Sequence, residues 1–476
     1  MKYRGSMKAA GSMTQGAPLG LLLRFAVPLM LGDMVHQAYT IADSMAVGRM
    51  IGVRAFAAVS AGGFFYWMVL VIIFGFSHGF GTLIAQYFGA GDRRSLGCAC
   101  ALSLELGAVI ALVMTALCLL LLRPVLSVMH TPQDIFEDTV RYLRVMFAGI
   151  LFTFIGSVLS AVFRALGDSK TPLCAFIASA ALNIVLDIAL IRWTGLGVAA
   201  AALATVITQA LSALFCFWRL FRRREVRLRR RDFAPDRKVI GELLRLGAPM
   251  GARDCIAAAG GTVIQYVING YGTIAIAGIA AAKKLYSLLF IIGGGLDGAA
   301  ATFIAQNYGA RRFDRIASGM AATRRIMLAG LLFIMPLMFF AGRRVLGLFI
   351  SGSSEETGAV LDTAVNQMRV CLVLLPALYM LFLYRSGLQG MGNSFMPMVS
   401  GFLEAGLRAA AALILPSFFG LWGVYIAEPI GWPLMALQLF AAFRADCRKK
   451  RAAGDEASGG TANQRFDGPP AAHRSG

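Results

Sequence analysis

Long apolar stretches with few charged residues run through most of this chain. They are continuous and do not alternate with a period of two, so they predict membrane-crossing helices and not a β-barrel. With 58% hydrophobic residues, the 476-residue chain is expected to be an all-α, multi-pass membrane protein. A crossing helix needs about 20 apolar residues. We predict twelve spans, at 21–47, 55–84, 96–122, 139–161, 172–192, 197–219, 243–270, 274–304, 324–349, 362–387, 396–418 and 421–443.

The first half of the chain repeats in the second half. An even number of spans in each copy gives both copies the same orientation. The repeat therefore predicts two six-helix lobes related by a pseudo-two-fold axis along the membrane normal. Three motifs occur twice in the same order: LLRFAVP at 22–28 and LLRLGAP at 243–249, IAQYFGA at 84–90 and IAQNYGA at 304–310, and, more weakly, FRALGDSKTP at 163–172 and LQGMGNSFMP at 388–397.

The same pattern divides the chain into lobes and connecting segments. The last segment is rich in Gly, Ala, Ser and charge, so it is expected to be disordered. The predicted parts are an amino-terminal segment at 1–20, a first lobe at 21–221, a basic linker at 222–242, a second lobe at 243–446 and a tail at 447–476.

The chain has a net charge of +20, and its basic residues are distributed according to the predicted topology. Lys and Arg are concentrated in the termini and the loops after even-numbered spans. By the positive-inside rule, this distribution places both termini and the linker in the cytoplasm. We expect the protein to lie in the inner (plasma) membrane. The basic run RRREVRLRRR at 222–231 is interpreted as an orientation signal and not as a nucleic-acid site. We expect a monomer in the lipid bilayer, without a nucleic-acid partner.

A polar stripe runs along the first span. Asp33, His36, Tyr39 and Asp43 follow one another at steps of three or four residues, so they share one helix face. Ionisable groups inside a bilayer are costly, and they mark functional sites by default. The stripe therefore predicts a face that lines a cavity or the bundle interior.

A second polar group lies in the fifth and sixth spans. Asn183 and Asp187 are four residues apart on one face, and Thr205 follows in the sixth span. Together with Asp43 they form an oxygen-rich set, which suits Na⁺ or carboxylates that exchange a proton. The alternative is that these residues form interhelical hydrogen bonds, which are worth roughly 0.6–2 kcal/mol each.

The second half offers looser candidates. Asp254, Gln265 and Asn269 lie on one face of the seventh span, where they either line a cavity or, for Asp254, pair with the adjacent Arg253. Glu404 and Arg408 have the spacing of an ion pair on one helix. Three further charged residues within spans have no partner that the sequence identifies: Lys283, Lys284 and Glu428.

The repeated motifs of the first half, together with YTIAD at 39–43 and LNIVLD at 182–187, resemble the multidrug and toxic compound extrusion (MATE) family of bacterial exporters. The resemblance covers roughly residues 20–445. It implies twelve helices in two lobes that form a V, and secondary active efflux of amphipathic, often cationic, compounds driven by Na⁺ or H⁺, with no other cofactor. Matched position by position, it places the family's amino-lobe cation site on Asp43, Asn183, Asp187 and Thr205, with Tyr39 adjacent.

Two other classes of protein are alternatives. A lipid-linked oligosaccharide flippase of the same superfamily would line its cavity with cations, for which Lys283, Lys284 and Arg253 are candidates. A membrane-embedded enzyme would need a catalytic motif in an aqueous loop, and the loops are short and lack one. We therefore expect no enzymatic activity. In the antiporter, Pro28 and Gly32 are expected hinge points of the first span.

Overall fold

The computed structural model describes residues 12–223, 225–226, 228–347 and 355–463, and all regular secondary structure in these ranges is helical. Two helices begin at an aspartate, Asp92 or Asp236, whose carboxylate accepts hydrogen bonds from free backbone N–H groups of the first turn. The helices are α1 (Pro18–Met50), α2 (Val53–Ala90), α3 (Arg93–Val128), α4 (Gln133–Ala148), α5 (Ile150–Ala165), α6 (Lys170–Thr194), α7 (Val198–Phe221), η1 (Arg230–Phe233), α8 (Arg237–Asn269), α9 (Gly272–Gly309), α10 (Phe313–Gly347), α11 (Glu355–Gly390), α12 (Phe395–Ile414), α13 (Pro416–Phe419), α14 (Leu421–Ala427) and α15 (Gly431–Asn463).

Each predicted span coincides with one helix or with two consecutive helices. Ten of the described helical segments are long and apolar enough to cross a membrane, and α4 with α5 forms a bent eleventh. The bend of 46° lies at Gly149, where any side chain would overlap Val206 of α7. The remaining predicted span, the seventh, is α8, which is less apolar because it carries Arg253 and Asp254.

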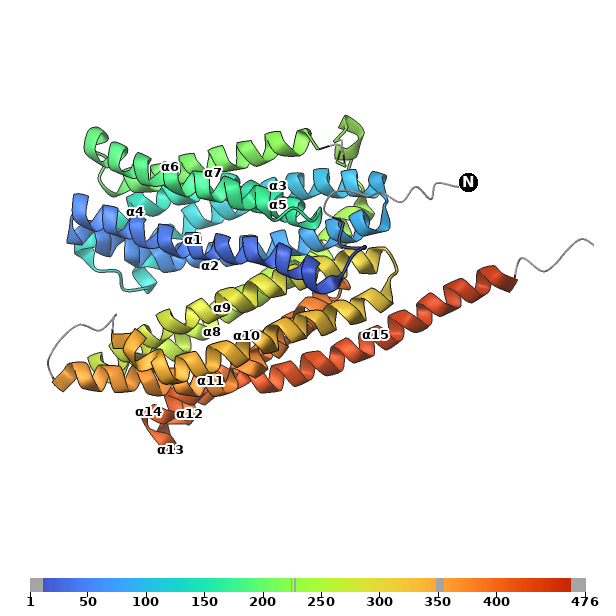
Figure 1. Cartoon of the computed structure of the whole chain (residues 1–476). Helices are drawn as coiled ribbons and strands as arrows, with labels where there is room; N and C mark the ends of the chain where they lie inside the picture. The colour runs from blue at the N-terminus through green and yellow to red at the C-terminus, as the bar shows by residue number, and fades with distance from the viewer. Residues whose placement is uncertain (1–11, 224, 227, 348–354, 464–476) are drawn as a thin grey trace, which may run out of the picture.

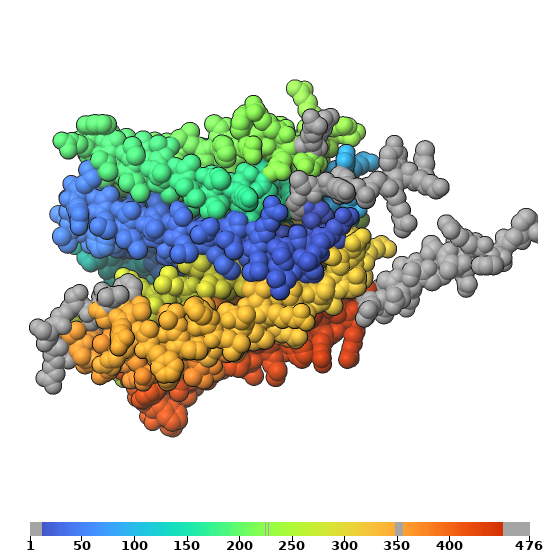
Figure 2. Space-filling view, viewed as in Figure 1, coloured from blue at the N-terminus to red at the C-terminus, as the bar shows by residue number. Residues whose placement is uncertain are grey.

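The helices form two lobes (Figure 1). Helices α1–α7 form one bundle and α8–α15 form the other. In space-filling view the blue-to-green lobe lies against the yellow-to-red one (Figure 2). The lobes diverge away from the end at which α1 begins and α15 leaves the bundle, which we call the terminal side. Contacts between the lobes come mainly from α2 against α8 and α9, and from α1 against α9.

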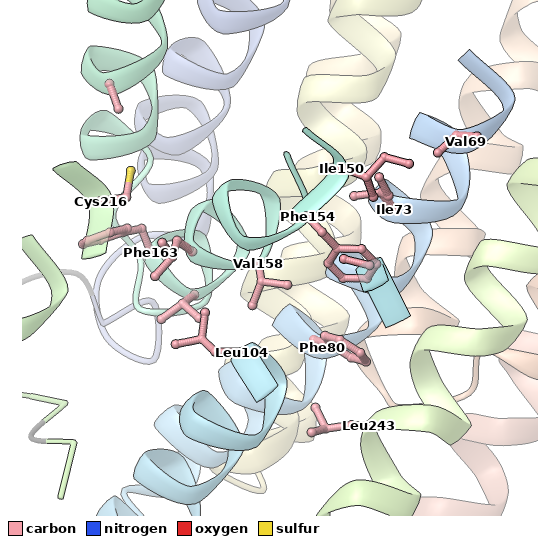
Figure 3. Packing of buried hydrophobic residues seen from close by; sticks show 14 of the residues in the cluster. Val69, Ile73, Phe80, Leu104, Ile150, Phe154, Val158, Phe163, Cys216 and Leu243 are labelled. Carbon is pink, nitrogen blue, oxygen red and sulfur yellow. The ribbon is translucent and has the colours of Figure 1, made fainter. Parts of the chain in front are cut away.

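Each lobe has its own apolar core, and each core includes the start of the other lobe's first helix. In the first lobe, Phe154 of α5 packs with Phe80 of α2, and Leu243 of α8 lies beside Phe80 (Figure 3). In the second lobe, the core takes in Leu22 and Phe25 of α1. Leu22 and Leu243 are equivalent in the repeat, so the exchange is reciprocal.

Glycines bring α2 and α8 into close contact across the lobe interface. A Cβ atom at Gly75 would overlap the backbone of Gly251, and one at Gly79 would overlap the backbone of Gly247. Small residues allow helix backbones to approach in this way in membrane proteins, where van der Waals packing drives association.

The end of the chain differs from the sequence-based expectation. Helix α15 continues to Asn463, so residues 447–463, assigned above to a disordered tail, are helical here. The segment contains Lys, Arg, Ala and Glu, which favour helix, and it extends a helix that is already formed. Residues 464–476 lie outside the described part, as do residues 1–11 of the amino-terminal segment and 224 and 227 of the linker.

Candidate functional site

A polar cluster lies inside the first lobe, where α1, α6 and α7 meet. Asp187 and Asn183 of α6 are 0% and 1% exposed, and Thr205 of α7 is also buried. From α1, the Tyr39 hydroxyl lies 3.5 Å from the Thr205 hydroxyl. The structure thus brings together the residues of three helices that the sequence selected, with Asp43 as the fifth member.

The Asn183 amide connects α6 to α7. With its nitrogen turned toward Asp187, it donates to Oδ2 of that carboxylate over 2.8 Å, while its oxygen accepts from the Thr205 backbone N–H at 3.1 Å. In the opposite orientation the nitrogen lies 3.4 Å from the Thr205 hydroxyl and 3.5 Å from that of Thr208. We adopt the first orientation because it satisfies both ends of the amide with shorter hydrogen bonds.

The two carboxyl groups of the cluster face each other. Asp43 and Asp187 lie within hydrogen-bonding reach. A hydrogen bond between two carboxyl groups requires a proton on one of them. Each group also has one buried oxygen, Oδ1, without a partner in the described part of the chain. The pair is therefore chemically suited to a shared proton or to a hard cation that uses the free oxygens.

An aromatic cavity of about 740 Å³ opens beside this cluster. Trp67 of α2, Phe176 of α6 and Phe290 of α9 contribute aromatic rings to it. His36 of α1 lines the same cavity and stacks on Phe176, with the ring centroids 5.8 Å apart. Asp33 borders the cavity as well, so the first two residues of the polar stripe face this cavity, whereas Tyr39 and Asp43 lie in the polar cluster.

A smaller cavity of about 340 Å³ lies between the lobes. Asp254, predicted as a cavity candidate, lines it, and its Oδ1 accepts a hydrogen bond from Arg253 Nε at 2.8 Å. Three further charged residues line this cavity that the sequence analysis did not select: Arg164, Asp297 and Arg385. Asp297 and Arg385 lie within predicted spans, so a complete survey of charges inside the spans would have found them.

The second lobe has an internal charge network instead of a carboxylate pair. Arg408 lies 3.9 Å from Glu404, which agrees with the predicted ion pair, and it also bonds to Glu428. Lys283 approaches the other oxygen of Glu428 at 3.8 Å. Arg408 is the repeat equivalent of Asn183, so a fixed guanidinium lies where the first lobe has an amide.

Gln265 and Asn269 lie apart from these sites. Both are exposed on α8, and the Gln265 amide donates to the Asn269 side chain at 2.9 Å. They do not line either of the two cavities described above.

Comparison with known proteins identifies the family. The family model described as MatE matches residues 28–189 and 249–414, most of both lobes. The chain belongs to the MATE family. The two matched segments correspond to the two copies of the repeat, and the matched first half contains four of the five members of the polar cluster.

Relatives of this MATE protein are named for drug resistance and export. A probable multidrug resistance protein of Bacillus subtilis, YoeA, is 26% identical over 415 residues, which are 84% of each chain. The multidrug export protein MepA of Staphylococcus aureus is 25% identical over 420 residues, which are 86% of this chain and 90% of MepA.

Solved structures have the same fold as this MATE protein. A MOP superfamily transporter from Pyrococcus furiosus superposes with a TM-score of 0.84 at 23% identity, over 92% of this chain and 97% of that chain. A multidrug resistance MATE transporter in an outward-facing conformation gives 0.83 at 23% identity, over 92% and 97% of the two chains. The chain is thus a multi-pass membrane transporter with the two-lobe MATE fold.

Proposed function

We propose that this MATE protein exports amphipathic organic compounds, organic cations among them, in exchange for Na⁺ or H⁺. The observation that carries the proposal is the pair formed by the buried Asp187 and the partly buried Asp43, held with Asn183, Thr205 and Tyr39. Two carboxyl groups in contact with each other inside a membrane protein are costly. Such a pair is most readily explained as a site at which a proton or Na⁺ binds and leaves.

Coupling requires that the ion and the substrate favour different arrangements of the lobes. The polar cluster lies on the same helix, α1, that lines the aromatic cavity through Asp33 and His36. Binding of a cation between Asp43 and Asp187 changes the contacts of α1 with α6 and α7. A movement of α1 that accompanies these changes alters the shape of the cavity. The ion and the substrate therefore favour different positions of the same helix.

The aromatic cavity suits amphipathic compounds. Its volume of about 740 Å³ is in the range of sites for drug-sized ligands. Rings such as those of Trp67 and Phe176 provide apolar contact and attract organic cations through their faces. The flippase alternative is less well supported, because Lys283 and Arg253 each have a carboxylate partner and the relatives are named for multidrug export.

The positive-inside rule supports a cytoplasmic position for both termini and the linker, in the plasma membrane. With that orientation, the closed terminal side is cytoplasmic and the lobes diverge toward the outside. A monomer suffices for this mechanism, because one chain contains both lobes, the polar cluster and the cavity.

Transport in everted membrane vesicles tests the proposal. A panel of amphipathic dyes that includes ethidium is offered while a Na⁺ gradient or a pH gradient is imposed separately. We expect one of the two gradients to drive uptake into everted vesicles that contain the protein and not into empty ones. If neither gradient drives transport of any dye, the antiport proposal is wrong.

A further inference from the structure

The cavity between the lobes lies on the pseudo-two-fold axis of the repeat. More than half of its lining residues form pairs that the repeat relates to each other, one from each lobe. A ligand in this cavity would therefore contact both lobes at once, and its contacts would change whenever the lobes move. Three equivalent pairs illustrate the symmetry: Leu29 with Met250, Asp33 with Asp254, and Thr82 with Thr302.

The symmetry of the cavity is broken by its arginines. Arg164 of α5 is equivalent to Gln389, which also lines the cavity. Arg253 and Arg385 come from the second lobe, and their equivalents in the first lobe are small and uncharged, Gly32 and Ser160. Three guanidinium groups from two lobes thus converge on one enclosed space.

The aspartates of the cavity engage only part of these donors. Arg385 Nη2 donates to Asp297 Oδ2 at 2.9 Å, as Arg253 does to Asp254. Arg253 Nη1 and Arg385 Nε remain buried without a partner in the described chain. The nearby Gln389 Nε2 and Asp297 Oδ1 are also buried without a partner, so among the described buried atoms of this cavity three donors and one acceptor lack a hydrogen bond. Buried donors without partners cost about 1–3 kcal/mol each, and a bound acceptor would remove that cost.

Arg164 is the least engaged of the three arginines. Among the described residues, no hydrogen bond or ion pair connects it to another side chain, although Asp33 lines the same cavity. Its position is also special, because it borders both the cavity on the axis and the aromatic cavity. The two cavities share Arg164 with Leu29, Asp33 and His78, so they are adjacent.

We propose that the cavity on the axis binds the acidic group of an amphipathic substrate, a carboxylate or a phosphate, with Arg164 as the main contact. The apolar body of the same molecule lies in the adjacent aromatic cavity, against Trp67 and Phe176. Planar donors of arginine match the paired oxygens of such groups. The proposal deepens the transport function above and rests on it, since it names the substrate class of the same central site.

Matched naphthalene probes test this assignment on the purified full-length protein in phosphatidylcholine nanodiscs. The probes are 1-naphthaleneacetate, 1-naphthyl phosphate, 1-naphthalenemethanol and 1-naphthylmethylamine, which share one ring system and differ in the head group. We expect the two acids to bind about tenfold or more tightly than the alcohol, from one or two charge-assisted hydrogen bonds. Equal binding of the alcohol, or preference for the amine, would overturn the assignment.

Arginine variants locate the contact. In Arg164→Gln the preference for the acids should fall by about tenfold, while binding of the alcohol stays within about twofold. Arg164→Lys should restore part of the preference, because it restores the charge. Arg192→Gln, at an exposed arginine of α6, is the control and should change nothing. Unchanged acid binding in Arg164→Gln contradicts the proposal.

Two further experiments are needed. The first distinguishes a lipid head group from a soluble amphiphile as the natural acid, and the second distinguishes failure of this inference from failure of the antiport proposal. Phosphatidylglycerol added to the nanodiscs displaces the acid probes if the natural acid is a lipid head group, and leaves them bound if it is a soluble amphiphile. Both results agree with an acidic ligand. In the everted vesicles, gradient-driven transport of ethidium without any preference for acids would remove this inference and leave the antiport proposal standing.

Discussion

The side-chain amide of Gln306 donates a hydrogen bond of 2.9 Å to the backbone carbonyl of Ala165, from the second lobe to the first. Its repeat equivalent, Gln86, donates a hydrogen bond of 2.9 Å to the carbonyl of Gly390, from the first lobe to the second. Ala165 and Gly390 are themselves equivalent positions. A reciprocal pair of hydrogen bonds therefore joins the lobes on the terminal side, where alternating access would require them to separate.

Loss of both amides should make the terminal side easier to open. The double variant Gln86→Leu with Gln306→Leu removes both hydrogen bonds between the lobes, worth about 1 kcal/mol each. It also removes the bond that the Gln306 side-chain oxygen accepts from the Met13 backbone N–H at 2.8 Å. Hydrogen exchange measured by mass spectrometry should accelerate at the ends of α2 and α9 and not in α4. Gln133→Leu, at an exposed glutamine of α4, is the matched control. Unchanged exchange in the double variant would show that the pair does not hold the lobes together.

The carboxyl pair of the first lobe should be essential for coupled transport. We expect Asp43→Asn and Asp187→Asn each to abolish gradient-driven efflux of ethidium, because an amide cannot exchange a proton and binds Na⁺ more weakly. Membrane expression should be unaffected. Asp138→Asn, in a partly exposed ion pair with Arg141 on α4, should retain the wild-type rate. A wild-type rate in either site variant would exclude this pair as the coupling site.

The glycine contact between α2 and α8 gives a test of lobe packing. Gly79→Ala places a methyl group against the backbone of Gly247, whereas Gly63→Ala on the same helix meets open space. We expect Gly79→Ala to lower the melting temperature and the transport rate, and Gly63→Ala to leave both near wild type. Thermal unfolding of the two purified variants in detergent provides the comparison. Equal behaviour would mean that α2 and α8 do not need this close approach.

The charge network of the second lobe should be important for stability. Glu428 bonds to Arg408 in a pair whose side chains are only 13% and 14% exposed. Removing one partner of a buried pair costs about 3–5 kcal/mol, because the other charge stays buried. Glu428→Gln should therefore unfold at a clearly lower temperature. Asp362→Asn is the control, because its pair with Arg343 is 60% and 56% exposed, and exposed pairs contribute about 0–1 kcal/mol.

Much of the architecture followed from the sequence, because the length of the apolar stretches and the internal repeat can be read without knowing which helices contact each other. They predicted the twelve spans, the two lobes and the polar faces of α1 and α6. The bend at Gly149 was not predicted, because it depends on contact with Val206 of a distant helix. Arg164 was missed for a related reason: it lies just beyond a predicted span, and only the approach of the second lobe makes it part of a cavity.

The first turns of α1 and α8 each pack into the core of the other lobe, and this arrangement affects how the chain folds during synthesis. The first lobe is synthesised before α8, so its core lacks Leu243 until that helix emerges. Leu22 of α1 has no core to enter until the second lobe has been inserted. Neither half of the chain is therefore complete by itself, although each carries six spans. Two halves separated at the linker should be degraded when produced singly and should assemble when produced together in one cell.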